Sequence, residues 1–147
     1  MTRSRIYLTL VLAFVLQIMP WSVWLRPEFV LLTLLYWLLR SPHLCGIGTA
    51  WVVGVLIDLM AGVLFGQHAL AFTLTAFLAL FYQRRLILFT NLQQTGYLFL
   101  LLLFNQSVMV LLQAYNGEHH LLSFLVSSVI SLAIWHLAHV YWLNRER

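Results

Sequence analysis

Long apolar runs, interrupted only by short polar or charged segments, dominate this 147-residue chain. Hydrophobic residues make up 63% of it and charged residues only 8%, whereas soluble domains carry about 25% charged residues. So few charges could not cover a surface that faces water. We therefore expect a polytopic integral membrane protein. Because a helix needs about 20 apolar residues to cross the bilayer, the chain has room for about five to seven spans in one domain.

Charges and clusters of Pro and Gly divide the runs into six predicted helices, which form an all-α transmembrane bundle in a single domain, residues 1–147. The helices are expected at about residues 6–25, 27–39, 45–65, 69–82, 96–115 and 121–143. At a rise of about 1.5 Å per residue, the helix over 27–39 is about 20 Å long, against a hydrocarbon core of about 30 Å. That helix and the one over 69–82 are therefore either short spans or re-entrant segments.

The arginines predict the topology. If all six helices cross, seven arginines lie on one side of the membrane and Arg26 alone lies on the other. The seven are Arg3, Arg5, Arg40, Arg84, Arg85, Arg145 and Arg147. Cytoplasmic loops carry the excess of basic residues, so both termini are expected in the cytoplasm. If the helix over 27–39 alone failed to cross, the arginines would be divided between the two sides, and this favours six crossings.

Apart from Glu28 at the very start of the second helix, Asp58 is the one acidic residue inside a predicted span, and glycines recur around it. Gly54, Asp58, Gly62 and Gly66 are spaced four residues apart, which places them on one face of the third helix and at its end. Small residues at this spacing let helix backbones approach closely. Since a charge in the bilayer interior costs about 2.5–3.5 kcal/mol, Asp58 should face a polar partner. We interpret this face as a seam for helix packing or for a partner protein, with proton or cation coupling as the alternative.

Two other polar groups interrupt the apolar pattern. Arg26, Pro27 and Glu28 open the second helix, where Pro suits the first turn. We place them at the outer face, either as a contact site or as a helix start whose Arg side chain reaches the interface. Asn105 and Gln106 lie near the middle of the fifth helix. They are expected to hydrogen-bond to other helices or to line a ligand cavity.

Known catalytic and binding patterns are missing from the sequence. There is no nucleophile–His–carboxylate arrangement, Walker loop or dinucleotide fingerprint, so neither enzymatic activity nor a cofactor is expected. His136 and His139 are three residues apart, but no Cys or carboxylate accompanies them, and no metal site is expected. The lone Cys45 is interpreted as a small apolar packing residue. The arginines occur singly or in pairs rather than as a patch, which argues against nucleic acid binding.

One stretch of the chain, about residues 26 to 75, resembles the rod shape-determining protein MreD family. The residues that carry the resemblance are Arg26-Pro27-Glu28, Leu35-Tyr36-Trp37, Pro42, the run from Gly54 to Leu59, Gly62, Gly66 and Ala69-Leu70. The rest of the chain agrees with that family in size, helix count and hydropathy.

The resemblance implies a place in the bacterial cell-wall elongation complex. MreD proteins are inner-membrane subunits that associate with the bitopic membrane protein MreC. Through MreC they associate with the actin-like MreB, the glycosyltransferase RodA and a penicillin-binding transpeptidase. The family is required for rod shape and lateral peptidoglycan synthesis, and it has no established catalytic activity. Its fold is similar to that of the six-helix substrate-binding subunits of energy-coupling-factor vitamin transporters.

Two hypotheses of function follow. In the first, the chain is a non-enzymatic interaction subunit of the elongation machinery, surrounded by membrane lipid. In the second, it is a small-molecule, vitamin-type binding subunit of a membrane transporter. The spans hold few polar side chains that could converge on a polar ligand, which favours the first. Under it, the face with Gly54 and Asp58 is the expected working surface.

Overall fold

The computed structural model describes residues 2–20, 28–62, 66–86, 88–115, 117 and 121–145. These residues form six α-helices, so the described part of the chain is all-α with the predicted number of helices. The helices are α1 (Thr2–Ile18), α2 (Phe29–Arg40), α3 (Ile47–Ala61), α4 (Gln67–Leu86), α5 (Asn91–Tyr115) and α6 (Leu121–Arg145). Arg26 and Pro27 lie outside the described residues.

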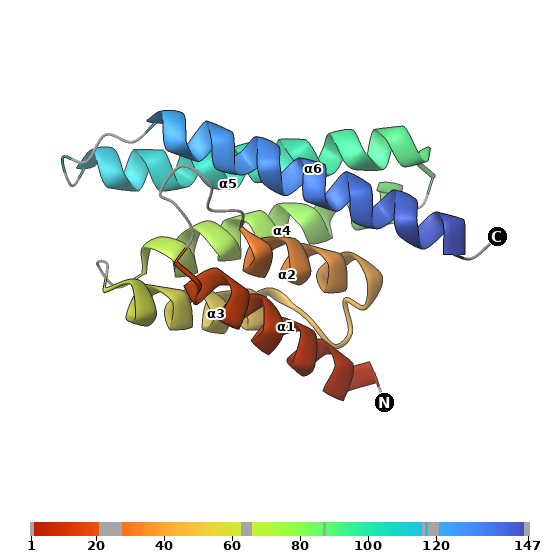
Figure 1. Cartoon of the computed structure of the whole chain (residues 1–147), viewed down its shortest axis with the longest axis horizontal. Helices are drawn as coiled ribbons and strands as arrows, with labels where there is room; N and C mark the ends of the chain where they lie inside the picture. Colours follow the sequence, from red (N-terminus) through yellow and green to blue (C-terminus); the bar gives the residue numbers. More distant parts are fainter. Residues whose placement is uncertain are drawn as a thin grey trace.

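The helices are arranged in pairs. In Figure 1, α5 and α6 run side by side along one edge, α2 and α4 occupy the middle, and α1 and α3 lie at the opposite edge. Helix α4 contacts α2, α3 and α5, and α1 packs mainly on α2. This arrangement makes α2 and α4 the interior of the bundle.

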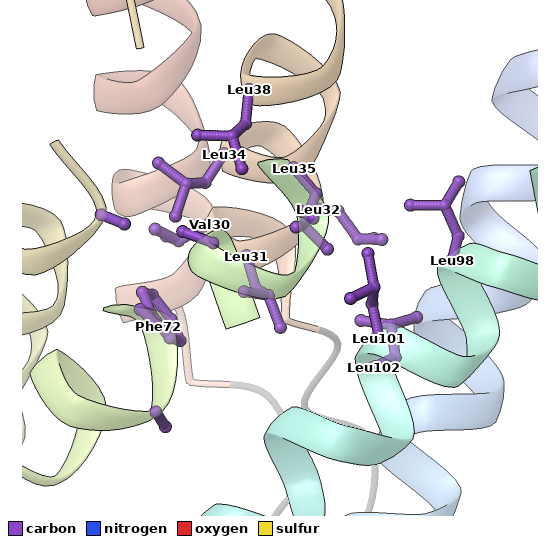
Figure 2. Close-up of a cluster of buried hydrophobic side chains, with 14 of the residues drawn as sticks. Val30, Leu31, Leu32, Leu34, Leu35, Leu38, Phe72, Leu98, Leu101 and Leu102 are labelled. Carbon is purple, nitrogen blue, oxygen red and sulfur yellow. The ribbon is translucent and has the colours of Figure 1, made fainter. Parts of the chain in front are cut away.

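The core forms around α2 because this helix is apolar on every side, as expected of a helix enclosed by others. Val30, Leu31, Leu34, Leu35 and Leu38 are fully buried. Figure 2 shows these side chains lying between Phe72 of α4 and a group of leucines from α5. The α5 leucines are Leu98, Leu101 and Leu102.

Several helix ends differ from the sequence prediction. Helix α1 runs over Thr2–Ile18 and not over residues 6–25, and α4 and α5 are longer than expected. Helix α4 continues past Tyr82 to Leu86 and places Arg84 and Arg85 in its last turn, where cations interact favourably with the carbonyl end of the helix dipole. Helix α5 begins at Asn91 rather than near residue 96. It starts there because Gln93 reaches back to accept a hydrogen bond from the backbone N–H of Thr90, 3.1 Å away, in the manner of a capping box.

Among the described residues, one helix is both long and apolar enough to cross a membrane, namely Asn91–Tyr115. Three shorter apolar helical stretches accompany it, Phe29–Arg40, Ile47–Ala61 and Leu125–Ala138.

One end of the bundle collects basic side chains, and we call it the arginine end. The first turn of α1, the last turns of α2 and α4, the start of α5 and the end of α6 all lie toward it (Figure 1). The hydrogen bond from Gln83 Nε2 to the backbone oxygen of Leu39, 3.0 Å long, joins the ends of α4 and α2 there. The described arginines at this end are Arg3, Arg5, Arg40, Arg84 and Arg85.

Candidate functional site

Asp58 accepts hydrogen bonds from the first turn of α4. Its Oδ2 accepts the backbone N–H groups of Gly66 (3.0 Å) and Ala69 (3.2 Å), and its Oδ1 accepts that of His68 (2.9 Å). The His68 ring Nδ1 also lies 2.8 Å from Oδ1. The N–H groups at a helix start have no partner within the helix, and the start carries partial positive charge. Asp58 is only 1% exposed, and its negative charge is thus stabilised by N–H groups of the same chain.

Gly54 provides the space for this contact. A Cβ atom at this position would lie 2.4 Å from the Cα of Ala69 and 2.6 Å from its nitrogen, so any other residue would push α3 and α4 apart. Gly54 and Asp58 therefore share a face of α3 that packs against the start of α4. At these two positions the face is in contact with α4, and a role for the rest of the seam in binding a partner stays a prediction.

Gly62 and Gly66 have a different role from the one their spacing suggests. Helix α3 ends at Ala61, so the prediction of a helix reaching residue 65 is wrong at this end. Gly62 terminates the helix with a left-handed φ of 63°, and Gly66 has a φ of 103° just before α4 begins. Since L side chains rarely adopt positive φ, both glycines are required by the backbone of the turn. A Cβ atom at either would meet no atom within 4 Å.

A second polar cluster, which we call the Glu28 node, consists of Glu28, Thr75, Asn105, Gln106 and Ser131. Gln106 Nε2 donates to Glu28 Oε1 at 2.7 Å, and Asn105 Nδ2 lies 3.4 Å from Oε2. The backbone N–H of Glu28 donates to Ser131 Oγ at 2.9 Å. Thr75 Oγ1 lies 3.3 Å from Asn105 Oδ1. The node therefore joins the start of α2 to α4, α5 and α6.

The Glu28 node lies halfway along the long helices. Asn105 and Gln106 are near the middle of α5, Thr75 near the middle of α4 and Ser131 near the middle of α6. Helix α2 starts at this level and ends beside Gln83, at the arginine end. With 12 residues, it covers only half the length of the bundle.

The carboxyl group of Glu28 points into the bundle toward two amide side chains, and its position at the outer face of the membrane stays a prediction. An apolar interior offers no water to a buried polar group, so the group is stabilised where donors exist. Sequence reasoning singled out Glu28, Asn105 and Gln106 separately. It did not connect them, and it missed Ser131, whose signal is a hydroxyl in the middle of an apolar run.

The remaining candidates form no further cluster. Cys45 is buried, and His136 is exposed on α6, while the side chain of His139 lies outside the described part of the chain. Within the described residues, no three His, Cys, Asp or Glu side chains gather in a way that could hold a metal ion.

Comparison with known proteins decides the family. A family model described as rod shape-determining protein MreD matches residues 2–144, nearly the whole chain. The chain belongs to the MreD family. The resemblance seen in residues 26 to 75 is thereby confirmed, and with it membership of a membrane-protein family that determines rod shape.

A curated MreD relative gives a more local match. The chain is 38% identical over 71 residues to the rod shape-determining protein MreD of Haemophilus influenzae. The alignment covers 46% of this chain and 44% of that protein, so it spans less than half of the relative's length. No solved structure matches the chain.

Proposed function

We propose that this MreD-family chain is a non-enzymatic, multi-pass inner-membrane subunit of the cell-wall elongation complex. In this proposal it binds an MreC-type bitopic protein and, through it, works with MreB, RodA and a penicillin-binding transpeptidase in lateral peptidoglycan synthesis. The observation that carries the proposal is the family match across residues 2–144.

The use of the interior polar groups supports a scaffolding role. The carboxyl groups of Asp58 and Glu28 are both bonded to donors of this chain, and each bond joins one helix to another. Asn105 and Gln106, which a transporter subunit would need for its ligand, are bonded to Glu28 instead. This favours an interaction subunit over a vitamin-type binding subunit.

The outward faces also suit a membrane subunit. Val11 of α1, Trp51 of α3 and Phe81 of α4 are all more than half exposed, and apolar surface of this extent is expected to meet lipid or other membrane helices. Clustering of the described arginines at one end supports a cytoplasmic position for that end and for both termini.

Within this placement, α2 is a half-span. Its N-terminal end at the Glu28 node lies at the depth of the middle of α5, near the bilayer centre, and its C-terminal end reaches the cytoplasmic surface. Helices that end inside the bilayer occur in membrane proteins where the helix end is buried against other parts of the protein. Here the start of α2 is held by hydrogen bonds to neighbouring helices. Asn105 and Gln106 donate to the Glu28 carboxyl group, and the Glu28 backbone N–H donates to Ser131.

Co-purification tests the proposed partnership. The chain, tagged and expressed in a rod-shaped bacterium, would be extracted in mild detergent, and MreC recovered with it would be quantified. The control is an equally tagged and equally abundant polytopic membrane protein from outside the elongation complex. Recovery of MreC well above that control is expected. Recovery equal to the control, with the chain folded and in the membrane, would contradict the proposal.

A further inference from the structure

A small cavity lies at the arginine end, between the first turns of α1 and the loop that joins α2 to α3. Its volume is about 220 Å³, and its lining consists of Arg3, Ile6, Tyr7, His43 and Leu44. Ile6 is buried in the bundle, so it anchors the α1 side. Arg3, Tyr7 and His43 are exposed, so the cavity is open to the surroundings on their side.

The loop side of the cavity is held in place by hydrogen bonds. The backbone N–H of Ser41 donates to the oxygen of Trp37 at 2.7 Å, and those of Leu44 and Cys45 donate to the oxygen of Ser41 at 3.0 and 3.1 Å. Cys45 is fully buried. His43 therefore sits on a hydrogen-bonded turn that continues α2.

The lining is chemically suited to an anion. The guanidinium of Arg3 offers several N–H donors that match a phosphate group, the Tyr7 hydroxyl donates, and the His43 ring donates an N–H in either tautomer. The cavity lining contains no acidic side chain. Cofactor and drug-sized ligands occupy sites of about 300–1,000 Å³, so this smaller cavity fits a single phosphate group better than a whole nucleotide.

An apolar stripe continues from the cavity along α1. Tyr7, Val11 and Val15 follow Arg3 at four-residue intervals, so they share its face of the helix, about 6 Å apart along the axis. They are 64%, 62% and 60% exposed. A basic opening at the arginine end followed by an exposed apolar stripe matches the headgroup and acyl chains of a phospholipid.

We propose that this cavity binds the phosphate group of an anionic membrane phospholipid, whose acyl chains lie along Tyr7, Val11 and Val15. The inference rests on the membrane placement proposed above, with the arginine end at the cytoplasmic surface. Basic pockets between helices on that side of a membrane bind anionic headgroups. The lipid would attach the first turns of α1 and the α2–α3 loop to the same headgroup layer.

The test compares two lipids that share a glycerol headgroup. The purified chain in neutral detergent would be titrated with phosphatidylglycerol, with monoolein, which has no phosphate, and with inorganic phosphate. Binding would be followed by native mass spectrometry and by the midpoint of thermal unfolding. The variants are Arg3→Gln and His43→Gln, with Arg5→Gln as the control, because Arg5 is exposed on the same helix turn but does not line the cavity.

Phosphatidylglycerol should bind and raise the unfolding midpoint, while monoolein should not. Arg3→Gln should weaken phosphatidylglycerol binding about fivefold, the effect of one basic residue near an anionic membrane surface, and His43→Gln should also weaken it. Arg5→Gln should leave binding close to that of the unchanged chain.

Two results would overturn the inference. If Arg3→Gln and Arg5→Gln weaken phosphatidylglycerol binding equally, the lipid is held by general charge attraction and not by a site at the cavity. The second result is that inorganic phosphate binds as tightly as phosphatidylglycerol, with Arg3→Gln abolishing that binding. This result would show that the site binds free phosphate and not a lipid headgroup. The measurement needs no partner protein, so its failure is distinct from failure of the wall-elongation role.

Discussion

Asp58 and Glu28 are carboxyl groups inside an apolar bundle, and each is stabilised by donors from this chain. Asp58 faces backbone N–H groups at the start of α4, and Glu28 faces side-chain amides of α5. A buried carboxylate without such donors would be strongly destabilising. These two residues therefore contribute to holding the helices of this chain together.

Replacing Asp58 tests its capping role. Asp58→Ala leaves three backbone N–H groups without an acceptor and is expected to lower the free energy of unfolding by about 1–3 kcal/mol or more. Asp58→Asn keeps one carbonyl oxygen and should lose less. The midpoint of thermal unfolding in detergent measures both. Equal midpoints for the unchanged chain and Asp58→Ala would contradict the capping role.

Gly54 offers a sharper test because α3 contains its own control. Gly54→Ala places a Cβ atom 2.4 Å from the Ala69 backbone and is expected to destabilise by about 1–3 kcal/mol through overpacking. Gly48 lies on the same helix and a Cβ there meets nothing within 4 Å. Gly48→Ala should be neutral or stabilise by up to about 1 kcal/mol, as expected from helix propensity. Similar unfolding midpoints for the two variants would disprove close packing at Gly54.

At the scale of single residues, sequence reasoning found the polar positions and not their partners. The spacing of Gly54 and Asp58 correctly places both on one face of a helix. Gln106 and Glu28, however, are 78 residues apart in the chain, and no local pattern links them. Their contact depends on how α2 and α5 lie in the bundle, to which the leucines between the two helices contribute.

At the scale of elements, most of the helix pattern could be predicted, and the errors concern helix ends. Hydropathy locates six apolar segments, but it does not detect caps. The Thr90–Gln93 capping box was present in the sequence and marks the start of α5 five residues before the apolar run suggests. The end of α3 was missed because Gly62 fits the four-residue spacing and only its positive φ shows that it closes the helix.

The half-length helix α2 depends on the Glu28 node, and this leads to a prediction. Glu28→Ala leaves the amides of Asn105 and Gln106 without an acceptor and should lower the free energy of unfolding by about 1–3 kcal/mol or more. Glu28→Gln keeps an acceptor oxygen of similar reach and should cost less. Hydrogen exchange of the first turns of α2, compared between the two variants, would locate the effect. Unchanged exchange in Glu28→Ala would show that the node does not hold α2.

For the whole molecule, the arginine end predicts which end of the bundle faces the cytoplasm. The proposed topology predicts that a fluorescent protein that matures only in the cytoplasm will fluoresce when fused to either terminus. The reason is that the described arginines lie at the end where α1 begins and α6 ends (Figure 1), and basic ends remain cytoplasmic. A dark fusion at one terminus, with full-length protein present in the membrane, would contradict this topology.

The shape of living cells tests whether this chain helps to determine rod shape. A rod-shaped bacterium deleted for its own MreD would express this chain, and the length-to-width ratio of the cells would be measured by microscopy. We expect the unchanged chain and Gly48→Ala to restore rods, and Gly54→Leu to restore them poorly because α3 and α4 cannot pack. If cells stay round while the unchanged chain is present in the membrane at normal amounts, together with the host's MreC, the chain does not determine rod shape in this way.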